Sequence, residues 1–102
     1  MASNILIADK NKETTEKLSE FLQSHDYVPY PANDGEEALN LLKNHDFDML
    51  LVNVDLPNRT GIELLDQVSS ICPKTFSIVI SEKATVESAI EALKKGAIDF
   101  FI

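Results

Sequence analysis

The chain has 102 residues, the length of one domain; 44% of them are hydrophobic and 25% are charged. This composition is typical of a globular chain and excludes extensive disorder. Its 17 acidic and 9 basic residues give a formal net charge of −8, which argues against direct binding to nucleic acid. No apolar run approaches the roughly 20 residues of a membrane helix, and no signal peptide is visible. With a single cysteine, these features predict a cytoplasmic protein without membrane contact.

Short apolar runs alternate along the chain with stretches of helical spacing, which is the pattern of βα units around a parallel sheet. The first strand is expected at residues 5–8, followed by a helix with apolar positions Leu18, Phe21 and Leu22. A second strand is expected at residues 27–31. Its two prolines cannot donate ladder hydrogen bonds, so we place this strand at an edge of the sheet.

Two capping patterns mark the starts of the next two helices. Asp34 is the expected N-cap of one helix, with Glu37 three residues later. The continuously apolar residues 49–52 then predict a strand that is covered on both faces. Thr60 and Glu63 form a capping box at the start of the helix that follows.

The last third of the chain repeats the same alternation. A fourth strand is expected at residues 76–80 and a helix across residues 86–93, which ends at Gly96. Residues 98–102 begin a fifth strand. The sequence therefore predicts one doubly wound α/β domain over residues 1–102, arranged as (βα)₄β.

Polar side chains follow three of the predicted strands. In a doubly wound sheet, sites form outside the carboxyl ends of the strands, where the strand order reverses. If the first, third and fourth strands are neighbours, six residues converge there: Asp9, Lys10, Asn53, Asp55, Ser81 and Glu82.

Several ordered motifs along the whole chain resemble the receiver domain of two-component response regulators. They are "ILIADKN", "ANDGEEALNLL", "FDMLLVNVDLPNRTGIELL", "SIVIS" and "ALKKGAIDFF". The resemblance implies a flavodoxin-like fold with strand order 2-1-3-4-5. It also implies an active site with two acids after strand 1, an Asp acceptor ending strand 3, a Ser or Thr ending strand 4, and a Lys after strand 5.

This sequence departs from that set at several positions. Asp9 matches the first acid, but Lys10 stands where the second is usual. Asn53 occupies the acceptor position, four residues before the matching Pro57, and Ser81 matches the hydroxyl position. The Lys would fall past residue 102. The chain therefore resembles a degenerate pseudo-receiver, because a neutral carboxamide cannot attack phosphorus to form an acyl phosphate.

The same departures weaken the metal site that the resemblance implies. Its ligand positions here are Asp9, Asn53 and Asp55, so we expect Mg²⁺ binding to be weak or absent. We further expect Lys10 to pair with Asp9 and to stand in partly for the metal, with Glu82 in the same pocket. The side chain of Asp55 is expected to be solvated.

The resemblance also implies a switch and a docking surface. Ser81 and Phe100 match the switch positions. The docking surface of helix 4 and strand 5 includes Glu87, Glu91, Lys94 and Phe100. A histidine kinase or an output domain of the same pathway is the implied partner. Receivers have a final helix beside the first helix, and the chain is predicted to be truncated before it. The apolar face left bare would then favour a homodimer.

Two other functions remain open from the sequence. The first is a conventional receiver in which Asn53 was introduced to block phosphorylation, which leaves Lys10 unexplained. The second is a small flavodoxin-like enzyme or cofactor binder, which lacks a Gly-rich phosphate loop after the first strand, where the sequence reads "ADKNKE". The preferred interpretation is a module that is not an enzyme and that acts through protein contacts.

Overall fold

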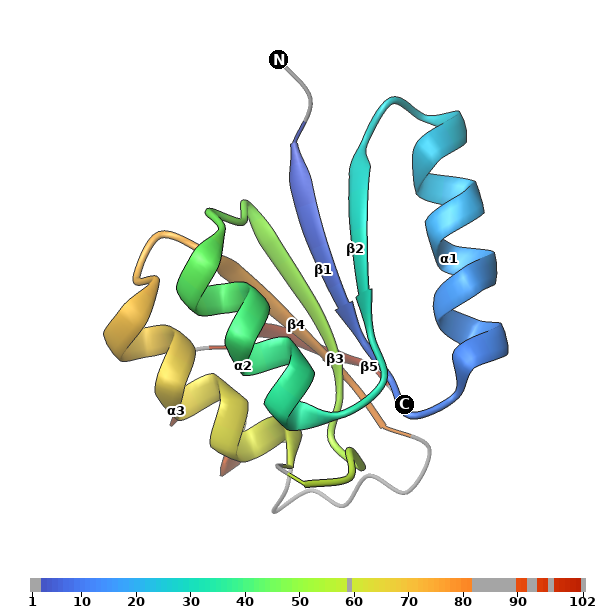
Figure 1. Ribbon diagram of the computed structural model, residues 1–102. Coiled ribbons are helices and arrows are strands. Elements are labelled where there is room, and N and C mark those ends of the chain that lie inside the picture. Colours follow the sequence, from blue (N-terminus) through green and yellow to red (C-terminus); the bar gives the residue numbers. More distant parts are fainter. Residues whose placement is uncertain (1–2, 59, 82–89, 92–93, 96, 102) are drawn as a thin grey trace.

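The computed structural model describes residues 3–58, 60–81, 90–91, 94–95 and 97–101. Five parallel strands form one sheet in the order β2-β1-β3-β4-β5 (Figure 1). The elements are β1 (Asn4–Ala8), α1 (Lys12–Ser24), β2 (Val28–Ala32), α2 (Gly35–Asn44), β3 (Met49–Asn53), α3 (Gly61–Ile71), β4 (Phe76–Ile80) and β5 (Ala97–Phe101). The predicted flavodoxin-like class and strand order are confirmed, and the proline-containing strand β2 lies at an edge.

The buried core lies on one side of the sheet, under α2 and α3 (Figure 1). Alternate residues of a strand point to opposite faces, so one set from each strand faces this core. The largest fully buried members from the strands are Leu6, Leu50, Val52 and Val79, and the largest from the two helices are Leu42, Leu64 and Leu65. This layer fixes the sheet and the two helices relative to one another.

The other face of the sheet is covered less completely in the described part of the chain. There α1 lies against β1 and β2 (Figure 1). Phe21 of α1 is 60% exposed, and Phe76 at the start of β4 is 59% exposed. Leu18 and Leu22 are only half-buried, as are Leu51 and Ile78 on the strands. The expected apolar stripe of α1 is therefore present but partly open to solvent.

The starts of α1, α2 and α3 are each held by a capping side chain at the carboxyl edge of the sheet. Asp34 accepts from the Glu37 N–H of α2 at 2.7 Å, and Thr60 accepts from the Glu63 N–H of α3 at 3.2 Å, which confirms both predicted caps. Asn11 caps α1 in the same way.

Most of the helix predicted across residues 86–93 lies outside the described residues. None of the helices in the described segments has the length and apolar character that crossing a membrane requires.

Gly61 is the first residue of α3, and it allows that helix to start directly against the end of β3. A Cβ added at Gly61 would meet the backbone oxygen of Asn53 at 2.7 Å and the Cα of Val54 at 2.8 Å. Both neighbours are backbone atoms, one at the end of the central strand β3 and one just after it, so neither can move cheaply. Glycine at this position therefore sets how closely α3 approaches the residue that ends β3.

The substitution Gly61→Ala should lower the free energy of unfolding by about 1–3 kcal/mol, the usual cost of forcing extra atoms into a packed site. Urea denaturation measures this loss. Ser70→Ala, at an exposed position of the same helix, is the control and should change stability by less than about 0.5 kcal/mol. Equal stability of the two variants would show that the backbone yields at residue 61.

Candidate functional site

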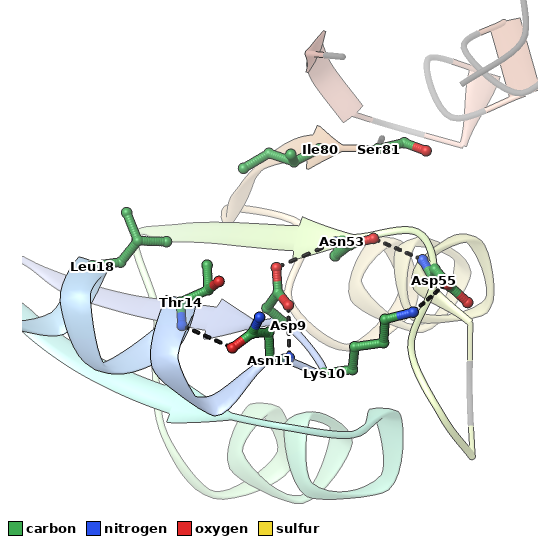
Figure 2. Close-up of a pocket in the computed structure, with 9 residues that line it drawn as sticks. All are labelled: Asp9, Lys10, Asn11, Thr14, Leu18, Asn53, Asp55, Ile80 and Ser81. Carbon is green, nitrogen blue, oxygen red and sulfur yellow. Dashed lines mark hydrogen bonds and ion pairs between the residues drawn. The ribbon is translucent and has the colours of Figure 1, made fainter. Parts of the chain in front are cut away.

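The site lies at the switch point of the sheet, between β1 and β3. These two strands pair in parallel from Ile5 with Met49 to Ala8 with Val52, so the residues that follow them emerge side by side. A cavity of about 270 Å³ opens there (Figure 2). It is lined by Asp9, Lys10, Asn11, Thr14, Leu18, Asn53, Asp55, Ile80 and Ser81. The structure thus brings together five of the six residues predicted to converge, and the sixth, Glu82, lies outside the described residues.

The side chain of Asn53 makes two hydrogen bonds of opposite sense in this cavity. Its Nδ2 donates to the Asp9 carboxylate, Oδ2, at 3.2 Å, and its Oδ1 accepts from the Asp55 N–H at 2.9 Å (Figure 2). Only one orientation of the amide serves both partners. A carboxylate at this position would keep the second bond but would have no proton to give Asp9.

Asp9 is held on both of its carboxylate oxygens. Oδ2 accepts from Asn53, and Oδ1 accepts from the Asn11 backbone N–H at 2.8 Å. The Asp9 backbone oxygen accepts from the Asn33 side chain at 2.9 Å. Sequence reasoning missed the roles of Asn11 and Asn33 here. The N-cap position of Asn11 before a helical stretch was a signal that could have found it.

Lys10 makes an ion pair with Asp55, with 2.6 Å between Nζ and Oδ2 (Figure 2). The sequence led us to expect Asp9 as its partner and a solvated side chain at Asp55. Two donors, the Asn53 amide and the Asn11 N–H, already satisfy the Asp9 oxygens. The side chains of Lys10 and Asp55 are 55% and 67% exposed, so the pair forms at the mouth of the cavity.

The described pocket residues, as they are arranged, do not offer the ligand set of a divalent cation. Magnesium takes oxygen ligands in near-octahedral geometry. Here one carboxylate, on Asp9, is committed to two N–H donors, and the other, on Asp55, is paired with the ammonium of Lys10. Within the described ranges, no three His, Cys, Asp or Glu side chains are grouped so that they could hold a metal ion.

The two predicted switch residues are described to different extents. Ser81 is buried, 7% exposed, and lines the cavity just after β4. Phe100 lies in β5, and its register partner is Val79 in β4. The side chain of Phe100 lies outside the described residues. Of the predicted docking surface, Glu91 and Lys94 are exposed, and Glu87 lies outside the described residues.

Cys72 lies at the opposite end of α3 from the cavity. Burial raises the pKa of its thiol, and the nearby Asp46 carboxylate raises it further. The thiol is therefore protonated at neutral pH and is a poor nucleophile.

The fold and the position of the cavity define a class: doubly wound parallel α/β domains with a polar pocket at the switch point. The sequence model of the response regulator receiver domain matches residues 5–102. The chain belongs to the response regulator receiver domain family.

Known proteins similar to this chain agree with that assignment. The transcriptional regulatory protein ZraR of Escherichia coli K12 is 30% identical over 99 residues, which are 97% of this chain and 22% of ZraR. A CheY-like receiver domain protein from Methanospirillum hungatei superposes with a TM-score of 0.96 at 25% identity and covers 99% of this chain and 81% of that one.

A response regulator from Burkholderia pseudomallei superposes with a TM-score of 0.93 at 26% identity, over 97% of this chain and 58% of that one. Its crystal structure has a phosphorylated aspartic acid, a calcium ion and citrate. The present chain thus spans about a fifth of ZraR and just over half of this regulator.

The substitution Asn53→Asp should destabilise the metal-free protein by about 1–2 kcal/mol. It would place two carboxylates, on residues 9 and 53, about as close as the present 3.2 Å contact. At that distance, repulsion amounts to between about 1 kcal/mol in water and 5 kcal/mol at an effective dielectric of 20. Urea denaturation in the presence of a chelator measures the loss.

The control for this experiment is Asn40→Asp, which makes the same change of charge at an exposed position of α2. It should leave stability nearly unchanged. If Asn53→Asp were as stable as the parent chain in chelator, the hydrogen bond from Asn53 to Asp9 would not matter to the pocket.

Proposed function

We propose that this receiver-family domain is a pseudo-receiver, a signalling module that is not phosphorylated at residue 53 and works through protein contacts. The observation that carries the proposal is the side chain of Asn53. Acyl-phosphate formation needs an anionic carboxylate that attacks phosphorus in line. The amide of Asn53 has no such oxygen, and its Oδ1 and Nδ2 are already engaged by Asp55 and Asp9.

The metal part of the proposal follows from the same pocket. A structurally similar regulator contains a phosphorylated aspartic acid and a calcium ion. In this chain the position that would hold the acceptor is an amide, and Lys10 places a positive charge at the pocket mouth. We therefore propose that Mg²⁺ binds weakly or not at all, and that the domain is not an enzyme.

The proposed partners are proteins of a two-component pathway. ZraR, a transcriptional regulatory protein, is much longer than this chain, which supports an output domain as one partner. A histidine kinase is the other proposed partner, with Glu91, Lys94 and Phe100 on the docking surface. The proposed location is the cytoplasm.

A conventional receiver with an introduced Asp-to-Asn change is the competing proposal. It accounts for Asn53 but not for Lys10, whose ion pair with Asp55 fills the mouth of the same pocket. The similarities to receivers give no support to a flavodoxin-like enzyme.

A homodimer is a second proposal, and the exposed apolar side chains on the α1 side of the sheet favour it. Phe21 and Phe76 are 60% and 59% exposed there, and Leu18, Leu22 and Ile78 are half-buried. A second copy of the chain would cover this surface.

The parent chain should gain no phosphoryl group when it is incubated with Mg²⁺ and acetyl phosphate, and intact-mass spectrometry measures this. The reason is the missing nucleophile at residue 53. As the control, the double variant Lys10→Asp, Asn53→Asp should respond to Mg²⁺ and then beryllofluoride with amide shifts around residues 9, 53 and 81. A phosphoryl group on the parent chain, mapped for example to Asp55, would overturn the proposal.

The dimer is tested by sedimentation equilibrium over a range of concentrations. We expect Phe21→Gln to raise the dimer dissociation constant about tenfold or more, because it removes an aromatic side chain from the proposed contact. Ile71→Gln, at a 39% exposed position of α3 on the other side of the sheet, is the control and should leave the constant unchanged. A parent chain that stays monomeric at millimolar concentration would contradict the dimer.

A further inference from the structure

At two positions of the pocket where the resemblance implies acidic side chains, this chain has hydrogen-bond donors. Lys10 Nζ lies 2.6 Å from the carboxylate of Asp55, and Asn53 Nδ2 lies 3.2 Å from the carboxylate of Asp9 (Figure 2). We propose that Lys10 and Asn53 together replace a bound divalent cation and so order the pocket without metal. This inference rests on the proposed function and adds to it that the site is held in one arrangement by its own side chains.

The charge of the cavity supports this replacement. Among the described residues, its charged lining side chains are two carboxylates, Asp9 and Asp55, and one ammonium, Lys10, which sum to −1. A pocket with three carboxylates would reach the same sum only after it bound a divalent cation. This pocket therefore has that charge with no metal, and a further cation would have to displace the ammonium.

The ion pair also connects two loops that are far apart in the sequence. Lys10 lies in the turn between β1 and α1, and Asp55 lies in the loop of residues 54–58 that follows β3. That loop in turn holds the start of α2, because the backbone oxygen of Pro57 accepts from the Gly35 N–H at 2.9 Å. The same loop holds the start of α3, because the backbone oxygen of Val54 accepts from the Gly61 N–H at 2.9 Å. The ammonium of Lys10 thus tethers a loop that contacts the starts of α2 and α3.

The effect of Lys10 is expected to be local. Its side chain is 55% exposed and that of Asp55 is 67% exposed, and exposed ion pairs contribute little to global stability. Loss of the pair should therefore loosen the loop without unfolding the domain. The loop reports its own order through two amides: Asp55 N–H, which donates to Asn53 Oδ1, and Leu56 N–H, which donates to the Val54 oxygen.

The test is amide hydrogen exchange in a chelator, with the parent chain compared to Lys10→Met, which keeps the length of the stem and removes the charge. Exchange at Asp55 and Leu56 should become about two- to fivefold faster, the range expected from losing an exposed ion pair. The matched control is Lys17→Met, which removes the exposed pair between Lys17 and Glu13 on α1. It should leave both amides unchanged.

If amide exchange in Lys10→Met is faster throughout the domain, the first test no longer reports on the loop alone, and a second measurement is needed. Added Mg²⁺ should slow exchange at Asp55 and Leu56 in Lys10→Asp, where a metal can return, and should leave the parent chain unchanged. Equal protection of these amides in the parent chain and Lys10→Met, or equal slowing by Mg²⁺ in the parent chain and Lys10→Asp, would overturn the replacement. These exchange measurements contain no phosphodonor and therefore do not test phosphorylation. Phosphorylation of the parent chain by acetyl phosphate would refute the proposed function in a separate experiment.

Discussion

The parallel pairing of β1 with β3 is the constraint on which the pocket depends. The two strands are in register from Ile5 with Met49 to Ala8 with Val52, so Asp9 and Asn53 leave the sheet beside each other. The side chains of Leu6, Leu50 and Val52 lie in the buried core beneath α2 and α3, and a slip of one residue would turn this set to the other face of the sheet. Hydrophobic burial on one side of the sheet thus helps to position the polar side chains of Asp9 and Asn53 at its carboxyl edge.

Within that frame, hydrogen-bonding capacity decides how the polar residues are used. An amide both donates and accepts, so Asn53 joins the Asp9 carboxylate to the Asp55 N–H, which a carboxylate could not do. The ammonium of Lys10 then meets the carboxylate of Asp55 at the cavity mouth. Departures at residues 10 and 53 are therefore mutually consistent: each supplies a donor to a different acid.

The strand order came from the resemblance to receiver domains, and the structure confirms it. The helix caps at Asp34 and Thr60 and five polar residues of the pocket could be predicted from the sequence itself, because capping and strand ends are local signals. The sequence was not sufficient for the partner of Lys10. That choice depends on the donors that already occupy Asp9, and one of them, the Asn53 amide, comes from another strand. The functional roles at Ser81 and Phe100 stay predictions.

The two faces of the sheet differ in how completely they are covered. The pocket lies at the carboxyl edge of the sheet, next to the less covered face. Leu18 and Ile80 line the cavity beside the polar residues, and both are half-buried side chains. Leu18 also belongs to the partly open apolar surface of α1 that includes Phe21. A protein that covers this surface would therefore contact a wall of the pocket, and the order of the pocket would in turn affect the shape that such a partner meets. Under the proposed function, this shared wall would be a direct physical link between the site and a protein contact.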